Sequence, residues 1–367
     1  MNNPDHQHYI PKSYLKNFAR IDKKKKRFVE ILDKSTQEIK IVSTRSICVK
    51  KGLYTLSKTE TNDPYFVENY YAKNVDDIYP QVYELLTNEE ITSISNNQKR
   101  KILYTLMSLY FRTPKFLNSI NRLTDESLNK VMMLVDPDQD EITIDYLGQD
   151  LKFYRHEFDE VKQRLYEQNR QDFISTHLQQ WHEFVAFKYQ CAISVFKVEG
   201  DIDLITSDNP VIIHSSVQNR FHLYDPTNII EVPLDRRHYL LIYPNTEKAN
   251  STNILRGMKD KFFGLTLNLQ VQKKAEQWII GYPESCRKHV VDQAKYGEDN
   301  EDNRKIVQLM EQRARLMVEL LEVMEKYGFP STEVADKVKE YKSFECFEGN
   351  HDLEKIAHEL KQHGFDV

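Results

Sequence analysis

The residues best suited to chemistry lie in two short stretches, about 200 residues apart. The first is His6–Phe18, which combines histidines, tyrosines and lysines with a few apolar side chains. His8 is a candidate general base because a neutral imidazole accepts a proton near pH 7. Lys12 is a candidate phosphate contact. A lone histidine is equally at home as a structural residue, so His8 leaves both interpretations open.

The second stretch is Thr206–Pro210, which lies where one expected strand ends and the next begins. Asp208 and Asn209 would then project from a tight turn at the rim of a sheet. Asp208 offers a carboxylate for a metal ion or for acid–base chemistry, and Asn209 an amide that orients a ligand. The alternative is an ordinary Asx-turn, in which such side chains bond their own backbone and proline fixes the next φ.

Several common catalytic classes lack their sequence signatures. The chain contains neither G-x-G-x-x-G nor G-x-x-x-x-G-K-[ST], which argues against a dinucleotide fold or a P-loop. It also lacks H-E-x-x-H and G-x-S-x-G, which argues against a zincin and an α/β-hydrolase. Its four cysteines are far apart and form no C-x-x-C pair, so we expect buried free thiols rather than a metal site or disulfides.

A set of motif segments resembles an uncharacterised bacterial family, domain of unknown function 4238. The segments are His8-Tyr9-Ile10-Pro11, Tyr14-Leu15, Phe18, Leu53-Tyr54-Thr55, Arg112-Thr113-Pro114, Ile205 to Val211 and Val232-Pro233-Leu234. Their order and rough spacing extend the resemblance over about residues 6–282. It implies a relationship and no particular activity, and the last 70 residues lie outside it.

The stretch His8–Ser13 is also similar to the first strand of His-Asn-His endonucleases. In that family a histidine shortly before a proline-containing turn activates water. Gln7 stands where the family usually has an acidic metal ligand, and the next histidine after His8 is His156, so the compact metal unit of the family is missing. The similarity implies a reaction class, hydrolysis of phosphodiesters.

The leading hypothesis is therefore a metal-dependent phosphodiester hydrolase, similar to a nuclease, of a bacterial defence system. His8 would be the general base, Asp208 the metal ligand and Asn209 an orienting group, with Lys12 or Arg112 contacting phosphate and Mg²⁺ or Mn²⁺ as the cofactor. The alternative is a non-catalytic sensor or binding module for nucleic acid or protein.

Charge is distributed unevenly along the chain. The net charge is −5, but residues 1–60 carry 14 Lys/Arg against 6 Asp/Glu, and residues 298–367 carry 10 against 17. A basic N-terminal segment is a candidate nucleic-acid surface, since Lys and Arg contacts supply most sequence-independent affinity. The five consecutive cations Lys23–Arg27 also fit a turn that charge keeps soluble.

The elements that must position these residues indicate an α+β fold. The length of 367 residues and the 40% hydrophobic content are enough for a sizeable core. No apolar run is long enough for a membrane span and no leader precedes His6, so we expect a cytoplasmic protein without membrane contact.

The main domain is expected over residues 1–297 and has three parts. Residues 1–60 form a small antiparallel β module, in which runs 27–32 and 38–42 make a hairpin, followed by shorter strands at 47–49 and 52–56. Residues 61–190 are mainly helical, and residues 191–297 form a second antiparallel sheet with helices. The strands of this sheet are expected at 192–196, 203–206, 211–213, 229–232 and 239–243, and the last helical stretch of the middle at about 156–187, with a break near 169–172.

A helical appendage is expected over residues 298–367, after a polar linker at 297–303. Its first helix carries an apolar stripe from Ile306 to Met324, and two shorter helices follow. Because such a stripe must be covered, the appendage is a candidate site for a protein partner or for self-association.

Overall fold

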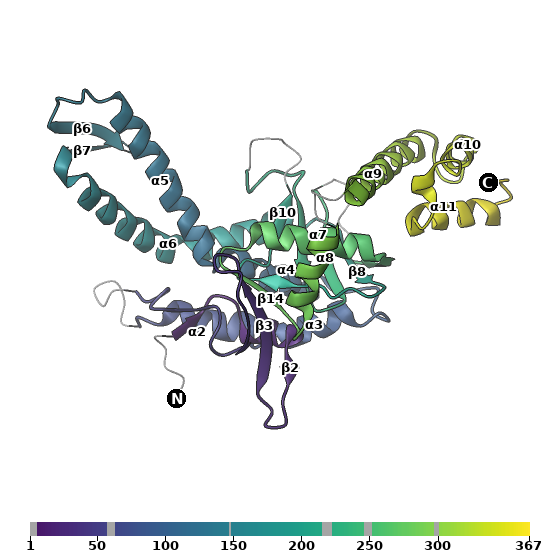
Figure 1. Cartoon of the computed structure of the whole chain (residues 1–367), viewed down its shortest axis with the longest axis horizontal. Helices are drawn as coiled ribbons and strands as arrows, with labels where there is room; N and C mark the ends of the chain where they lie inside the picture. Colours follow the sequence, from purple (N-terminus) through teal and green to yellow (C-terminus); the bar gives the residue numbers. More distant parts are fainter. Residues whose placement is uncertain (1–5, 57–62, 147, 215–221, 246–251, 297–300) are drawn as a thin grey trace.

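The computed structural model of the chain describes residues 6–56, 63–146, 148–214, 222–245, 252–296 and 301–367. It confirms the α+β class: sheets and helices pack together in a central body, and two extensions project from it (Figure 1). The helices are α1 (Lys12–Leu15), α2 (Phe66–Tyr71), α3 (Tyr79–Thr87), α4 (Asn96–Phe111), α5 (Pro114–Leu134), α6 (Phe158–Lys188), α7 (Lys261–Lys274), α8 (Ser285–Tyr296), α9 (Glu301–Tyr327), α10 (Thr332–Tyr341) and α11 (His351–Gln362).

The strands form two larger sheets and two small pairs. They are β1 (His6–His8), β2 (Arg20–Ile21), β3 (Arg27–Asp33), β4 (Ile39–Ser43), β5 (Val49–Lys51), β6 (Glu141–Tyr146), β7 (Gln149–Tyr154), β8 (Ile193–Val198), β9 (Thr206–Ser207), β10 (Ile212–His214), β11 (Ile229–Pro233), β12 (His238–Ile242), β13 (Ile254–Lys259) and β14 (Trp278–Gly281). One larger sheet has the order β10-β11-β12-β8-β13, and the other has β2-β3-β14-β9 with β4 beside β3.

The N-terminal β module is confirmed in its hairpin but is not a separate sheet. Strands β3 and β4 pair as expected. However, β3 also pairs with β14 and β14 pairs with β9, so residues near 207 and 280 complete the sheet. Strand β5 leaves this sheet and pairs with β1. The N-terminal residues are thereby built into the main body.

The second sheet differs from expectation at its edges. Strand β9, expected as part of this sheet, belongs to the first one. Strand β13 was not expected, and it runs parallel to β8. Its sequence Ile254–Lys259 contains glycine, arginine and lysine, which are not typical of a strand. Pairing along the whole length of β8 supplies the hydrogen bonds that outweigh this weak propensity.

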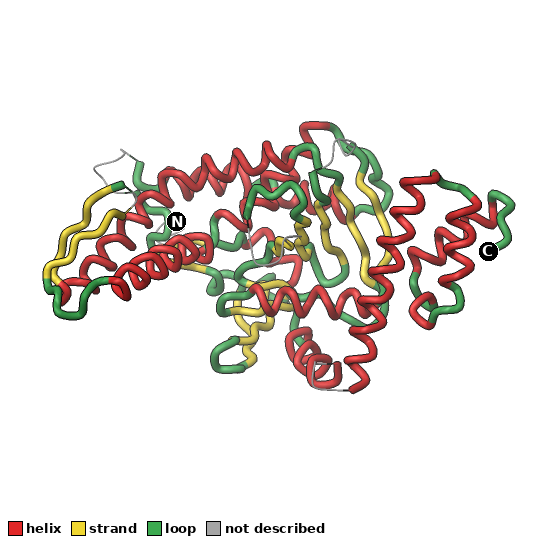
Figure 2. The backbone as a smooth tube through the Cα atoms, turned by 90° about the horizontal axis from the view of Figure 1, so that it is seen from above, coloured by secondary structure: helices red, strands yellow, loops and turns green. Residues whose placement is uncertain are grey.

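The helical middle contains a projecting arm. Helices α5 and α6 pack against each other, and the hairpin β6–β7 lies at the tip of the arm (Figure 2). The hairpin was not expected, and α6 is one continuous helix without the predicted break near 169–172. Apolar residues of the hairpin form a small core with α5 and α6: Leu128, Ile142, Ile144, Phe153, Val161 and Leu165. This core explains why a short hairpin is stable so far from the body.

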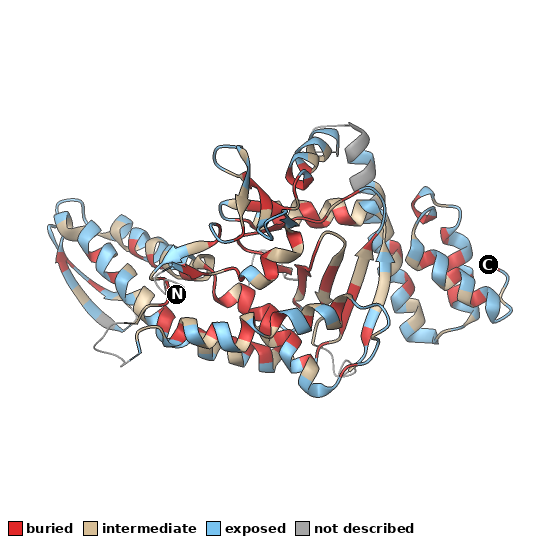
Figure 3. Ribbon diagram, turned by 90° about the horizontal axis from the view of Figure 1, so that it is seen from below, coloured by how far each residue is buried: buried red, intermediate tan, exposed pale blue. Residues whose placement is uncertain are grey.

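Most buried residues lie in the central body (Figure 3). Several motif residues lie there and connect segments distant in sequence. The Tyr14 hydroxyl donates to the Pro233 carbonyl over 2.8 Å and lies 2.6 Å from Thr206 Oγ1. The Tyr54 hydroxyl donates to the Arg112 carbonyl. The motifs behind the family resemblance therefore join the two sheets and the helical middle.

The C-terminal helices α9–α11 form their own apolar core. Leu316 and Leu320 of the expected stripe are buried against α10 and α11 of the same chain. Ion pairs Lys259–Asp352 and Arg313–Asp260 connect these helices with the body. Residues 297–300 of the expected linker lie outside the described residues, and 301–303 belong to α9. Whether the appendage folds and acts independently stays a prediction.

Candidate functional site

Arg112 lies at the C-terminal end of α4 and organises a buried polar cluster. Its side chain is fully buried, and Nη1 donates to Asp76 Oδ1 over 2.8 Å while Nη2 donates to the His8 carbonyl. The guanidinium carbon lies 4.4 Å from the centre of the Tyr71 ring. Any phosphate would have to displace these partners to reach the guanidinium. The contacts are those of a positioning residue, which fixes β1 against the helical middle, and they do not favour the expected phosphate contact.

His8 lies in the same cluster, with only 8% of its surface exposed. Burial is the main cause that lowers its pKa to about 4, and the charges of Lys12 and Arg112 lower it further. A hydrogen bond to the backbone of Arg45 acts in the opposite direction. The imidazole is therefore neutral at pH 7, and within the described part of the chain its Nε2 has no hydrogen-bond partner. This nitrogen is itself buried, so a ligand could bond to it only after neighbouring side chains moved.

A basic groove lies beside His8, with a volume of about 870 Å³. We define it by its cations and the residues between them: Lys12, Lys24–Arg27, Phe28 and Ser43–Arg45. Six of these nine residues are Lys or Arg, and all six are exposed. His8 is not part of the groove wall, but it bonds to the backbone of Arg45, and the charge of Lys12 lowers its pKa. The expected pair His8 and Lys12 is thus brought together.

The turn that presents the lysines is held by backbone bonds. Asp22 Oδ1 accepts hydrogen bonds from the backbone N–H groups of Lys24 and Lys26, at 2.9 and 2.7 Å. A further backbone bond runs from the Asp22 N–H to the Lys26 carbonyl. None of these bonds uses a lysine side chain. The turn therefore holds its shape while the ammonium groups remain available to an anion.

Asp208 and Asn209 occupy a different place, between β9 and β10. Asp208 Oδ1 accepts from the Glu276 N–H over 2.9 Å, and Oδ2 accepts from the N–H groups of Gln277 and Trp278 over 2.7 and 3.1 Å. Burial raises the pKa of Asp208, and these three donors oppose the shift. The amide of Asn209 donates to the Lys274 carbonyl over 2.9 Å. Both side chains anchor the segment between α7 and β14.

This arrangement leaves little room for a cation on Asp208. A metal ion would compete with the three backbone donors for the two carboxylate oxygens. Within the described residues, no group of three or more His, Cys, Asp or Glu side chains is placed to hold a metal ion. The contacts of Asp208 are therefore those of an anchor.

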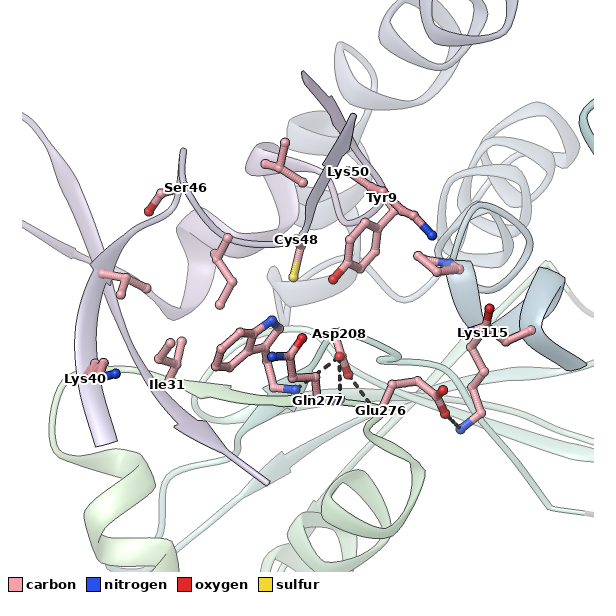
Figure 4. Close-up of a pocket in the computed structure, with 16 residues that line it drawn as sticks. Tyr9, Ile31, Lys40, Ser46, Cys48, Lys50, Lys115, Asp208, Glu276 and Gln277 are labelled. Carbon is pink, nitrogen blue, oxygen red and sulfur yellow. Dashed lines mark hydrogen bonds and ion pairs between the residues drawn. The ribbon is translucent and has the colours of Figure 1, made fainter. Parts of the chain in front are cut away.

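Asp208 also lines a cavity of about 600 Å³, which we call the Tyr9 cavity after the residue in its wall. Figure 4 shows Tyr9 and Cys48 on one side of it, with Asp208, Gln277 and Glu276 opposite. Lys115 lies at its edge, where Nζ forms a 2.9 Å ion pair with Glu276. Burial, followed by the charge of Asp208, raises the pKa of the Cys48 thiol well above its usual value, so this thiol is not a nucleophile.

The first strand separates the two regions. His8 is paired with Val49 at the end of β1, and the next N–H, that of Tyr9, donates to the Cys48 carbonyl over 3.0 Å. Successive side chains of extended backbone point to opposite sides. Accordingly, His8 is linked to residues of the basic groove and Tyr9 lines the cavity with Asp208. The structure brings His8, Lys12 and Arg112 together but places Asp208 and Asn209 elsewhere.

Sequence reasoning missed several residues of these sites. Arg45 reaches the groove from the segment after β4, and Glu276 and Trp278 reach the cavity from the other end of the domain. The alternation of the N-terminal strand was a signal that Tyr9 faces away from His8, but it did not indicate that Tyr9 and Asp208 line one cavity. No local signal in the sequence pointed to Glu276 or Trp278.

Comparison with protein families gives one match over most of the chain. A family model described as a protein of unknown function, DUF4238, matches residues 6–285. The chain belongs to this family. The DUF4238 region includes the groove and the cavity and ends where α8 begins. No curated protein and no solved structure gives a match.

Among the described residues, no helix is both long enough and apolar enough to cross a membrane.

Proposed function

We propose that the protein binds nucleic acid through the basic groove. The observation that carries the proposal is the convergence of six cations from three segments, α1, the β2–β3 turn and the end of β4, on one hollow. Sequence-independent affinity for nucleic acid comes mainly from such contacts, because each neutralised phosphate releases condensed counterions. The proposal agrees with the excess of positive charge in residues 1–60.

The local electrostatics also favour an anion. Burial and the charges of Lys12 and Arg112 lower the pKa of His8, so the imidazole is neutral when the groove is empty. A phosphate in the groove would screen Lys12 and would favour a proton on His8. We therefore expect the pKa of His8 to rise above about 4 when nucleic acid binds.

A second candidate function is hydrolysis of the bound phosphodiester with His8 as general base. It is favoured by the neutral His8 imidazole and by its Nε2, which has no partner among the described residues. A base of such low pKa becomes effective only when a bound phosphate raises the pKa toward the working pH. Mg²⁺ or Mn²⁺ is the cation to test. Lys12 would contact the phosphate, whereas the contacts of Arg112 and Asp208 give them positioning roles.

Binding is tested by fluorescence anisotropy with labelled DNA and RNA over a range of salt concentrations. The variant Lys24→Glu/Lys26→Glu removes groove cations but leaves the backbone bonds of the turn in place. We expect at least about a tenfold loss of affinity and a decrease of about 1–2 in the slope of log K against log salt. The matched control Arg122→Glu/Lys130→Glu reverses two exposed cations on the projecting arm and should bind normally.

Hydrolysis is tested on the same substrates with Mg²⁺ or Mn²⁺. If His8 is the base, His8→Gln should bind nucleic acid as the wild type does and yield no cleavage product. Cleavage by this variant would exclude His8 as the base. Equal affinity of the groove variant and the arm control would refute nucleic-acid binding at the groove.

A further inference from the structure

We propose that the Tyr9 cavity is a binding site for a nucleoside phosphate, either as a free nucleotide or as one unit of a single strand. The proposal does not depend on the groove, because cavity and groove are lined by different residues. The volume of about 600 Å³ lies in the range of small-molecule sites, about 300–1,000 Å³. The walls combine aromatic, cationic and hydrogen-bonding groups, which together narrow the class of ligand.

The aromatic part of the cavity suits a nucleobase. Tyr9 and Trp278 both line it, one from the segment after β1 and the other from β14. Each side chain is partly buried, so its ring is held in place and still reachable. Stacking on such a ring contributes about 1–3 kcal/mol per base and tolerates any base, because every base has a π face.

The cationic part suits a phosphate. Lys50 and Lys115 line the cavity, and α5 begins there at Pro114. Lys115 is held by Glu276 and by the Lys274 carbonyl, which Nζ contacts at 2.7 Å. Lys50 is exposed on β5 and free to move onto a ligand. An anion between the two ammonium groups would gain charge-assisted hydrogen bonds from both.

Polar side chains in the wall suit the remaining parts of a nucleotide. The amides of Asn118 and Gln277 can donate to and accept from the edge of a base, and the Glu276 carboxylate can accept hydrogen bonds from sugar hydroxyls. Asp208 takes no part, since backbone donors occupy its oxygens. Because Cys48 is a protonated thiol, the site is equipped for binding rather than for covalent chemistry.

Tryptophan fluorescence gives a direct test on the full-length protein. The chain has two tryptophans, and Trp181 is fully buried with Nε1 donating to the Tyr104 carbonyl. Trp278 is therefore the reporter. We expect AMP, GMP, CMP and UMP to quench the emission saturably, and adenosine or ribose 5-phosphate alone to bind at least about tenfold more weakly. Trp278→Phe should remove the signal, and calorimetry on the same variant should show weaker binding.

A matched pair of variants tests the position of the phosphate. Lys50 lines the cavity, whereas Lys51, the next residue of β5, is not part of its wall. Lys50→Glu should weaken nucleotide binding about tenfold or more, and Lys51→Glu should not. Lys24→Glu/Lys26→Glu should leave nucleotide binding intact, which separates this proposal from that of the groove.

A competition experiment distinguishes a free nucleotide from a nucleotide at the end of a single strand. A short 5′-phosphorylated single strand that displaces AMP would identify the cavity as a site for a strand end, and failure to displace it would identify free nucleotides as the ligands. The proposal is refuted if no nucleotide binds saturably, if ribose 5-phosphate binds as tightly as AMP, or if Lys50→Glu and Lys51→Glu bind AMP equally.

Discussion

The buried polar cluster around Arg112 and the neighbouring basic groove differ in how their polar side chains are used. Arg112 is buried and donates to Asp76 and the His8 carbonyl. Asp208, farther away, is also buried and accepts from backbone N–H groups. The groove cations are exposed, and the bonds that shape their turn come from the backbone. Arg112 and Asp208 therefore position the chain, whereas the groove cations remain available to a ligand. A motif residue is therefore not automatically a catalytic residue.

Replacement of Arg112 tests the contrast between buried and exposed polar residues most strongly, and we expect it to have the largest effect. Arg112→Met should destabilise the protein by about 3–5 kcal/mol, because it leaves the Asp76 carboxylate and the His8 carbonyl without their buried partner. Arg112→Lys should restore only part of this, since an ammonium cannot serve both acceptors in the same plane. Urea unfolding followed by circular dichroism measures the effect. A variant with wild-type stability would show that the guanidinium is not the anchor described here.

Asp208 should give the next largest effect. In Asp208→Asn an amide group replaces one oxygen and faces backbone donors, so we expect a loss of about 2–3 kcal/mol of stability. Lys40→Met, a change at an exposed residue that also lines the Tyr9 cavity, is the control and should unfold as the wild type does. Unchanged stability of Asp208→Asn would return Asp208 to the list of candidate ligands.

The buried histidines should make stability depend on pH. Burial lowers the pKa of His8, His177 and His289 to about 4, below the value of about 6.5 for an unfolded chain. Between these values the unfolded chain binds more protons, so stability should fall as the pH drops from about 6.5 to about 4. His177→Phe keeps an aromatic ring beside Phe173 and should flatten this dependence by on the order of 1–2 kcal/mol. Melting curves at several pH values test it, and an unchanged slope would mean that His177 does not titrate in this window.

Removal of the appendage should have the smallest effect on the body. Helices α9–α11 bury their apolar residues against one another and join the body through the pairs Lys259–Asp352 and Arg313–Asp260. A chain truncated after Tyr296 should remain folded, with a melting temperature lowered by a few degrees at most. Size-exclusion chromatography of both forms would show whether the appendage mediates self-association. Loss of a cooperative melt would mean that these helices belong to the main core.

The fold could be predicted where local patterns decide it. The hairpin β3–β4 and the helices α4, α7 and α10 follow from alternation, helical periodicity and caps such as Ser95, whose Oγ accepts from the Gln98 N–H. The parallel pairing of β13 with β8 could not be predicted, because it depends on a partner some 60 residues away. The same is true of the hairpin at the tip of the arm, where packing against α5 and α6 supplies the stability.

The site could be predicted only in part. The placement of His8 and Lys12 near each other follows from their closeness in sequence. The burial of Arg112 could not be foreseen, because arginine is seldom fully buried and its partners come from distant segments. Asp208 was expected to face a ligand, and only the structure shows three backbone donors, from about 70 residues further along the chain, directed at its carboxylate.

The order of strands in the sheet β2-β3-β14-β9 affects how this sheet can fold during synthesis on the ribosome. Its hairpin ends at Ser43, but its central strand β14 begins only at Trp278. At a synthesis rate of about 5–20 residues per second, roughly 10–50 s pass between synthesis of the hairpin and synthesis of β14. During this time the edge of β3 that will receive β14 is open to any other strand. The lysines of the β2–β3 turn and the charged ends of the hairpin would then act as gatekeepers, which repel other nascent chains until the proper strand arrives.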